Sequence, residues 1–304
     1  MKIGIPKALG YYYYSPFWKR FLSELDCTVI ESESSTRKIL QDGCAISPSE
    51  ACLPLKSFMG HVINLIDKVD ALFIPRMVCL QKKPQVRLGC PKYIALPDMV
   101  KAFLPAVKTV SPNLDYRKCS QQDSFVQSAQ EMGFSRKNGL KAYKAALEQS
   151  SSQMNLTQFP SIENEEQLTI AVLGHAYLVH DSFLSLNILN RLKSLGCRVL
   201  DFSAHGSSGS LKTQRKPVSW YFEEDILLSA EKLLASSHID GIVYLLSFGC
   251  GAGSITSEIM RLELSSPDTV PVMRVIVDEH TGEAGFNTRL ESYVDMLRMG
   301  KEVK

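Results

Sequence analysis

The sequence predicts an α/β protein of two Rossmann-like parallel-sheet domains, with a helical connector and a cleft between them. Short apolar runs alternate with longer amphipathic segments in both halves of the chain, as in a parallel sheet with helical crossovers. The 304 residues suffice for two ordinary domains, and a polar stretch without strand pattern separates the halves. We therefore expect an N-terminal α/β domain over residues 1–114, a helical connector over 115–167 and a C-terminal Rossmann-like domain over 168–304.

The C-terminal half shows the clearest alternation. Its apolar runs predict strands over residues 168–173, 198–202, 239–248 and 272–277. Apolar residues at helical spacing predict helices over residues 181–195, 220–235, 254–264 and 287–298. Gly196 suits the end of the first of these helices, and Ser254 is the expected cap of the third.

The N-terminal half repeats the pattern less regularly. Strands are expected over residues 3–5, 28–30, 71–74 and 107–110, and helices over 53–66, 125–132 and 140–147. The last two helices belong to the predicted connector. Ser15 and Pro16 predict the start of a further helix, because proline favours the first helical turn.

Composition and charge limit the classes of partner. The chain is 45% hydrophobic and 22% charged, which is typical of a globular protein with a substantial core. Its net charge of +2 gives no reason to expect a nucleic acid. No apolar run approaches the roughly 18–20 residues of a membrane-spanning helix, and the N-terminus does not resemble a signal peptide. We expect a cytoplasmic protein with neither a nucleic acid nor a membrane as partner.

The chain contains eight cysteines. In a reducing cytoplasm they are not expected to form disulfides, and the absence of a Cys-X-X-Cys pair argues against a zinc ribbon or thioredoxin-like site. A cysteine considered alone is most often a small buried apolar residue. Position adds information, because ligands bind beyond the carboxyl ends of strands in open parallel sheets. The cysteines in loops at or beside predicted strand ends are Cys52, Cys79, Cys90 and Cys250.

The loop SFGCGAGS over residues 247–254 has two functional interpretations. The spacing of Gly249, Gly251 and Gly253 does not match a dinucleotide-binding fingerprint, and the absence of a following Lys-Ser or Lys-Thr pair excludes a P-loop. Anion binding by the amides of the next helix stays open. Alternatively the loop presents Cys250 as a thiolate, because a helix N-terminus lowers the pKa of a thiol and glycines let a bulky group approach. Unrelated structural cysteines are the third interpretation.

Three further residues at predicted strand ends are candidates for proton transfer or ligand binding. His175 follows the strand over residues 168–173, and Glu279 and His280 follow the strand over 272–277. A histidine titrates near neutral pH and both residue types act as general acids or bases. The alternatives are a hydrogen-bonded loop histidine and acidic residues that cap the next helix or stay solvated.

Specific motifs recur along nearly the whole chain, and are weakest over residues 115–167. They read GIPKALGYYYYSPFWKRFLSEL, SEACLPLKSFMGHV, DALFIPR, CPKYIALPDMV, LGHAY, SFGCGAGS and VDEHTGEAGFNTRLESYVDML. With them the sequence resembles the activase-related branch of the 2-hydroxyacyl-CoA dehydratase and benzoyl-CoA reductase superfamily, the CoA-substrate-specific enzyme activases.

The resemblance implies two Rossmann-like domains whose cysteines hold a [4Fe–4S] cluster with one open iron. Its motifs map the ligands onto Cys52 in EACLP, Cys90 in CPK and Cys250 in FGCG, with Gly249 and Gly251 beside the cluster. Cys79 or a non-protein group is left as an alternative fourth ligand.

The resemblance also implies a function in anaerobic, low-potential chemistry. It points to an iron–sulfur protein like a 2-hydroxyacyl-CoA dehydratase subunit, which transfers electrons or carries out reductive radical chemistry on an acyl-CoA. The implied partners are an ATP-dependent activator protein and a second dehydratase-like subunit. The chain has no glycine-rich phosphate loops of an actin-like ATPase, so it would be the electron-accepting part. The alternatives are a non-catalytic cluster-carrying or scaffold subunit, and a zinc-binding or metal-free α/β protein.

Overall fold

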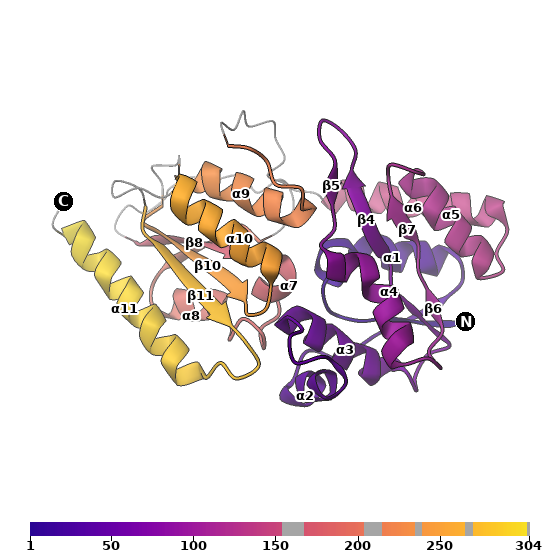
Figure 1. The fold of residues 1–304 in the computed structure, drawn as a ribbon, viewed down its shortest axis with the longest axis horizontal. Coiled ribbons are helices and arrows are strands. Elements are labelled where there is room, and N and C mark those ends of the chain that lie inside the picture. Colours follow the sequence, from indigo (N-terminus) through magenta and orange to yellow (C-terminus); the bar gives the residue numbers. More distant parts are fainter. Residues whose placement is uncertain (154–166, 204–214, 235–238, 265–269, 303–304) are drawn as a thin grey trace. The chain divides into compact units, whose positions relative to one another are not determined.

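The computed structural model describes residues 1–153, 167–203, 215–234, 239–264 and 270–302 (Figure 1). The chain divides into two compact units, and each is described by itself. Unit 1 comprises Met1–Asn155 and Val218–Phe222, and unit 2 comprises Leu156–Pro217 and Glu223–Lys304. Both units alternate strands and helices around a parallel sheet, so the predicted α/β class is confirmed. The predicted cleft between the domains stays a prediction.

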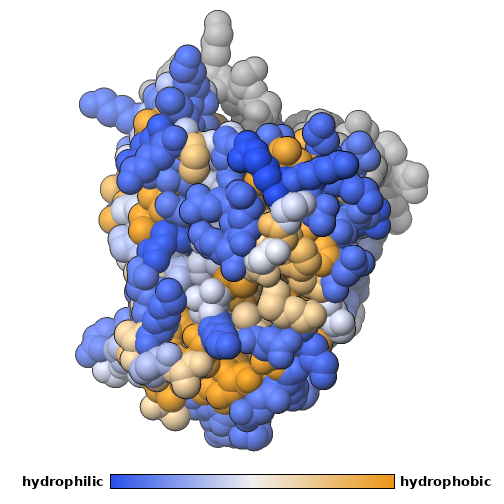
Figure 2. All heavy atoms as spheres, turned by 90° about the vertical axis from the view of Figure 1, so that its right-hand side faces the viewer, coloured by the Kyte–Doolittle hydropathy of each residue, from blue (hydrophilic) through white to orange (hydrophobic). Residues whose placement is uncertain are grey.

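Unit 1 contains a parallel sheet with the strand order β2-β1-β3-β6 and a smaller mixed sheet with the order β5-β4-β7. Its strands are β1 (Lys2–Ile5), β2 (Thr28–Glu31), β3 (Ala71–Phe73), β4 (Arg76–Gln81), β5 (Arg87–Leu88), β6 (Thr109–Val110) and β7 (Asn113–Asp115). Its helices are α1 (Tyr11–Glu24), α2 (Arg37–Ile46), α3 (Leu53–Leu65), α4 (Pro91–Phe103), α5 (Gln121–Glu131) and α6 (Arg136–Gln153). Hydrophilic residues cover most of the face in Figure 2, and apolar residues reach the surface in smaller patches.

Unit 2 contains one parallel sheet with the strand order β11-β10-β8-β9. Its strands are β8 (Thr169–Gly174), β9 (Arg198–Asp201), β10 (Gly241–Ser247) and β11 (Val272–Val277). Its helices are α7 (Ala176–Val179), α8 (Ile188–Ser194), α9 (Tyr221–Leu234), α10 (Gly251–Ile259) with the π-helical turn η1 (Met260–Leu264), and α11 (Glu283–Glu302). Helices α9 and α10 lie on one face of this sheet, and α8 and α11 lie on the other (Figure 1).

The two parallel sheets share one topology. In each, the first strand lies between the second and the third, so the strand order reverses beside the first strand. Connections after the first and third strands then leave toward opposite faces, which opens a ligand site at the carboxyl edge. This switch point lies at the ends of β1 and β3 in unit 1 and of β8 and β10 in unit 2. In unit 2 the strands on both sides of the switch point belong to the core, because β8 and β10 are buried along their whole length.

Helix α1 and the predicted helix over residues 181–195 differ from the expectation. Helix α1 begins at Tyr11 rather than Ser15, so Pro16 lies inside it. The helix continues through Pro16 because its apolar face, including Phe17 and Phe21, is buried. The predicted helix over residues 181–195 is reduced to α8, because Leu186 and Asn187 have left-handed φ values of 51° and 58° and interrupt it.

Some elements of the structure were not predicted, and the helices of the predicted connector belong to unit 1. Helices α2 and α4 and the mixed sheet of β4, β5 and β7 were not predicted. Segment 115–167, the predicted connector, supplies α5 and α6, and α6 packs against α1 within unit 1. Residues 154–166 of this segment lie outside the described residues. No helix among the described residues is long and apolar enough to cross a membrane.

Helices α2 and α3 cross in close contact through two glycines. A Cβ on Gly43 would overlap the carbonyl oxygen of Lys56, and a Cβ on Gly60 would overlap the carbonyl oxygen of Ile39. The backbones therefore approach more closely than any larger residue permits. This contact fixes α3, whose N-terminus begins beside Cys52.

His61 connects the same helix to the neighbouring strands through hydrogen bonds. His61 is fully buried, with Nδ1 2.8 Å from Ser32 Oγ and Nε2 2.9 Å from Ser35 Oγ. The backbone N–H of Lys7 also donates to Ser32 Oγ, at 2.8 Å. Burial, followed by the positive charge of Lys7, lowers the pKa of His61 to about 4. The imidazole therefore joins α3 to the ends of β1 and β2 in its neutral form.

Gly60→Ala is expected to lower the free energy of unfolding by about 1–3 kcal/mol, because an added Cβ forces the two helix backbones apart. Gly285→Ala in α11 is the matched control, since a Cβ there meets no atom within 4 Å. Alanine should stabilise that helix by roughly 0.5–1 kcal/mol relative to glycine. Urea unfolding of both variants measures the difference, and a Gly60→Ala protein as stable as the wild type would contradict the close crossing.

The free energy of unfolding is also expected to decrease as the pH is lowered from about 7 to about 4, because His61 titrates in this range only in the unfolded chain. The pKa of His61 is lower in the folded than in the unfolded chain, so the unfolded chain binds more protons in this window. The contribution of His61 to the free energy of unfolding is fully present above its pKa in the unfolded chain. It is lost as the pH falls toward the pKa in the folded chain, and the loss is on the order of 1–2 kcal/mol by pH 5. A melting-temperature profile against pH should be flatter for His61→Gln, whereas parallel profiles would refute this role.

Candidate functional site

The three cysteines singled out by the motifs occupy the same kind of position. Cys52, Cys90 and Cys250 are the N-cap residues of α3, α4 and α10, and each has an extended backbone. Among the described residues, none of the other five cysteines caps a helix. Unpaired amides and the positive end of the helix favour a negative group at an N-cap. The three positions therefore share a backbone setting, and of the three side chains that of Cys250 accepts a capping hydrogen bond while those of Cys52 and Cys90 do not.

Cys250 replaces Ser254 as the cap of α10, which corrects the sequence prediction. The amide N–H of Gly253 donates to Cys250 Sγ at 3.3 Å, and Ser254 Oγ donates to the carbonyl of Cys250 at 2.8 Å. The helix begins three residues earlier than the sequence prediction because a cysteine, which is not a usual cap, takes this role. Ser254 then lies in the first turn of the helix.

The glycines beside Cys250 have separate roles. Gly249 has a φ of 73°, in the left-handed region that favours glycine, and makes the turn between β10 and α10. Gly251 has open space where a Cβ would stand. Gly249 therefore shapes the loop, while Gly251 is exposed and a side chain there would meet no other atom.

Cys52 and Cys90 both lie near one buried tyrosine of unit 1. Burial raises the pKa of Tyr93 well above its usual range, and negative charge on Tyr13, Cys90, Tyr14 and Cys52 raises it further. The two thiols therefore share a neighbourhood that also contains tyrosine hydroxyls. Proline residues at the start of α3 and α4 set the backbone that follows each cysteine.

Gly89 holds the chain just before Cys90. A Cβ at this position would overlap the carbonyl oxygen of Met77 in β4, and the Gly89 N–H donates to the carbonyl of Val78 at 3.1 Å. The close approach to β4 thus determines where α4 begins. Sequence analysis singled out Cys90 by its place beside a predicted strand end and by its CPK motif, but the packing of Gly89 depends on β4, which was not predicted.

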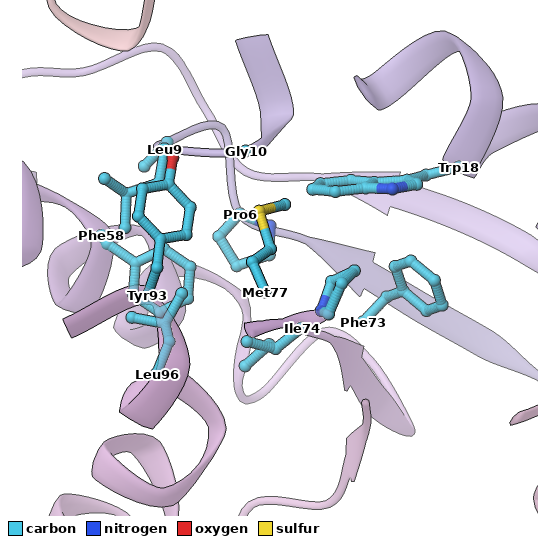
Figure 3. Close-up of a pocket in the computed structure, with 12 residues that line it drawn as sticks. Pro6, Leu9, Gly10, Trp18, Phe58, Phe73, Ile74, Met77, Tyr93 and Leu96 are labelled. Carbon is cyan, nitrogen blue, oxygen red and sulfur yellow. The ribbon is translucent and has the colours of Figure 1, made fainter. Parts of the chain in front are cut away.

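An apolar pocket lies at the switch point of unit 1 (Figure 3). Its lining includes Leu9 and Gly10 after β1, Ile74 after β3, and Met77 and Tyr93. The space inside holds roughly one water molecule. In this conformation the pocket is part of the packed core and does not accommodate an acyl chain.

The switch point of unit 2 contains a buried polar cluster. His175 follows β8, and its Nε2 lies 3.2 Å from Oε1 of Glu223 in the first turn of α9. Thr256 Oγ1 in α10 donates to the other carboxylate oxygen of Glu223 at 3.5 Å. All three residues are buried. The imidazole of His175 also stacks on Tyr177, with ring centroids 4.7 Å apart.

Tyr244 of β10 brings this cluster and Cys250 into one neighbourhood. Its side chain is 1% exposed, and its hydroxyl has no hydrogen-bond partner among the described residues. Burial raises the pKa of Tyr244 well above its usual range, and negative charge on Glu223 and Cys250 adds to the rise. The hydroxyl therefore lies within electrostatic reach of both the carboxylate and the thiol.

Sequence analysis identified His175 but missed Glu223 and Tyr244. Glu223 stands in a helix that was recognised only by its apolar periodicity, and Tyr244 stands in an apolar run. The usable signal was the pair of acidic residues, Glu223 and Glu224, in the first turn of an amphipathic helix. Only the register of β8 and β10 and the course of α9 bring these side chains together.

Glu279 and His280, the other two candidates, lie in a turn after β11. The turn is closed by Asp278, whose Oδ1 accepts hydrogen bonds from the His280 amide at 2.9 Å and from Thr281 Oγ1 at 2.7 Å. The side chain of His280 is exposed. Asp278 therefore organises the turn that carries Glu279 and His280.

Cys79 has a different setting from the three N-cap cysteines. It lies inside β4, is fully buried, and its thiol donates to the carbonyl of Gln81 at 3.3 Å. Within the described residues, no three His, Cys, Asp or Glu side chains are arranged as ligands of one metal ion. Cys52 and Cys90 belong to unit 1 and Cys250 to unit 2, so a cluster shared by all three stays a prediction.

Comparisons with known proteins identify a family. No curated protein matches the chain. Among solved structures, the SBP FpvC from Pseudomonas aeruginosa in complex with Mn2+ is 11% identical, over 100% of this chain and 99% of that chain. Its TM-score of 0.28 is too low to support an argument. The family described as the CoA enzyme activase uncharacterised domain matches residues 2–204, more than half of the chain, and confirms the activase-related resemblance. The chain therefore belongs to the CoA enzyme activase uncharacterised domain family.

Proposed function

We propose that this protein is an iron–sulfur protein similar to a 2-hydroxyacyl-CoA dehydratase subunit, in which Cys52, Cys90 and Cys250 bind a [4Fe–4S] cluster. The observation that carries the proposal is that these three cysteines, alone among those in the described residues, are helix N-caps. Thiolates are the usual ligands of iron–sulfur clusters, and helix N-termini stabilise their negative charge.

One further observation fits a ligand in unit 2. The buried hydroxyl of Tyr244 has no hydrogen-bond partner among the described residues, and such a group costs stability unless a ligand completes it. A cluster held by three cysteines would leave one iron open, as metal sites that act on substrates do.

The protein's own residues would bind and tune the group. When bound, the cluster would supply one electron at low potential to a substrate or partner. The Gly253 amide already donates to Cys250 Sγ, and such hydrogen bonds are one determinant of cluster potential. The hydrogen-bonded pair of His175 and Glu223 would hold a proton within the same unit.

The family membership supports CoA-related chemistry and an activase-type system. We propose an ATP-dependent activator protein as the electron donor, a dehydratase-like subunit as a further partner, and an acyl-CoA as the substrate of the complete system. Fe–S chemistry of this kind would require an anaerobic, reducing compartment, which agrees with the expected cytoplasmic location.

A non-catalytic, cluster-carrying subunit is the second candidate. The apolar pocket beside Tyr93 holds roughly one water molecule, so this pocket does not supply a site for an acyl chain in this conformation. In this alternative the protein would accept an electron and pass it to a dehydratase-like partner that binds the acyl-CoA.

The cluster is expected in protein purified without oxygen, at about four iron and four sulfide per chain with a broad visible absorbance band. Separate Cys52→Ser, Cys90→Ser and Cys250→Ser variants should each lose most of the iron and the band, because each removes a ligand. Iron and sulfide analysis measures the loss. Zinc alone, or no metal in the wild type, would refute the proposal.

Cys197→Ser is the matched control for these variants. Cys197 is buried, donates to the carbonyl of Leu195 at 3.9 Å, and has a pKa raised chiefly by burial, so it should not ligate iron. Its substitution should leave the iron content unchanged. Turnover of acyl-CoA thioesters with an activator and ATP would then support the enzyme, whereas reversible reduction without turnover would support the carrier.

A further inference from the structure

The strand registers show that unit 2 repeats the arrangement of unit 1. The paired residues are, in unit 1, Lys2 with Thr28 and Ile3 with Ala71, and in unit 2, Thr169 with Arg198 and Ile170 with Gly241. A side-chain contact recurs as well, because Asp70 and Asp240 each accept a hydrogen bond at 2.7 Å from the backbone N–H of the residue that begins the first strand. Corresponding positions of the two units can therefore be compared.

The segment that leads into and forms the second strand is also similar in sequence. It reads LSELDCTVIE over residues 22–31 and LKSLGCRVLD over residues 192–201. Asp26 and Gly196 occupy the same place in it, and both have left-handed backbones, with φ values of 55° and 79°. The comparison makes Glu31, the last residue of β2, equivalent to Asp201, the last residue of β9.

The two equivalent carboxylates are held by different partners. In unit 1, Glu31 Oε1 accepts a hydrogen bond from the Tyr11 hydroxyl at 2.8 Å and lies 2.9 Å from Lys19 Nζ. A lysine is charged throughout the neutral pH range. In unit 2, Asp201 Oδ2 lies 3.1 Å from His180 Nε2, and a histidine gains or loses its charge near neutral pH. Of these two contacts, the one in unit 2 is therefore the one that responds to pH near neutrality.

Ser203 completes the contact in unit 2 and shows which nitrogen of His180 titrates. The hydroxyl and the backbone N–H of Ser203 both donate to Asp201 Oδ1, at 2.5 and 2.9 Å. The hydroxyl has one proton, so its oxygen accepts from His180 Nε2, which lies 2.9 Å away. Nε2 therefore carries a hydrogen in both forms of the imidazole, and the proton that is gained and lost is on Nδ1.

We propose that His180, Asp201 and Ser203 form a pH-sensitive clasp, which ties the C-terminal end of α7 to the carboxyl end of β9 and holds most tightly when His180 is protonated. Protonation on Nδ1 adds a positive charge facing Asp201 and leaves the hydrogen bonds of Nε2 in place. The clasp lies at the carboxyl edge of the sheet, where ligands bind in proteins of this class. It does not depend on the proposed iron–sulfur cluster.

The surroundings of His180 set the direction of the effect. The hydrogen bond to Asp201 raises the pKa of His180, burial opposes the rise, and the charge of Asp201 adds to it. No other charged group of the described residues shifts this pKa, those of α8 included. The neighbouring Asp181 accepts hydrogen bonds from the amides of Phe183 and Leu184. The clasp is therefore fully formed below the pKa of histidine in the unfolded chain, about 6.5, and weakens as the pH rises through the higher pKa in the folded chain.

Nuclear magnetic resonance of the full chain, labelled with ¹⁵N at its histidines, tests the contact itself. The signals of His180 are expected to show a pKa above the ordinary value and, at high pH, the tautomer with hydrogen on Nε2. Asp201→Asn should lower the pKa of His180, because it removes the facing charge. Glu31→Gln, the equivalent change in unit 1, is the matched control and should leave that pKa unchanged. A pKa of His180 that is the same in Asp201→Asn as in the wild type would overturn the clasp.

Hydrogen exchange tests the effect on the end of β9. The Phe202 amide donates to the carbonyl of Val172 at 2.9 Å, and the Ser32 amide makes the equivalent bond in unit 1. Corrected for the intrinsic rate, the protection of the Phe202 amide should fall roughly twofold to fivefold between about pH 6 and pH 9, as expected for loss of a partly exposed ion pair. The Ser32 amide should keep its protection, and His180→Gln should abolish the pH dependence at Phe202.

The exchange measurement can also contradict the proposal. Equal losses of protection at Phe202 and Ser32 would indicate general loosening of the protein and would overturn it. Protection of the Phe202 amide that stays constant with pH, or that changes as much in His180→Gln as in the wild type, would overturn it as well.

Discussion

The parallel pairing of the strands is the constraint on which the rest of the structure depends. A parallel strand is followed by a crossover that returns the chain to its starting edge. Helices that follow the strands therefore begin at the carboxyl edge, where their first amide groups lack partners. In unit 2 this places the N-terminus of α10 and the residue after β8 at the same edge. Cys250 and His175 stand at these two places for that reason.

The same constraint explains how much of the fold the sequence predicts. Strands β8 and β10 are buried on both faces, so they form continuous apolar runs that are easily recognised. The edge strand β11 alternates between exposed and buried residues over its last four positions. It was predicted as well, because each of its residues except Arg274 is apolar. The first residue of a helix is harder to predict, because it depends on the N-cap. Gly10 precedes α1 and Cys250 precedes α10, and neither residue type is among the strongest N-caps.

The residues of the candidate site also differ in how well the sequence predicts them. Its cysteines stand in loops with glycine or proline, so local sequence and motif resemblance pick them out. Tyr244 carries no local signal, because it lies in an apolar strand, and the local signal for Glu223 is limited to the acidic pair in the first turn of its helix. Their relation to His175 and Cys250 comes from the pairing of β8 with β10 and from the return of α9 across the sheet. No pattern within one element contains that information.

The polar residues of unit 2 make physical sense only together. A buried carboxylate is costly unless it is paired and hydrogen-bonded, and Glu223 obtains a pair in His175 and a long hydrogen bond from Thr256. The hydroxyl of Tyr244 does not use this carboxylate, although the charge of Glu223 acts on it. Were the cluster of polar groups purely structural, a hydrogen bond between Tyr244 and Glu223 would satisfy both at once. The fold instead keeps the hydroxyl apart from the carboxylate, without a hydrogen-bond partner among the described residues.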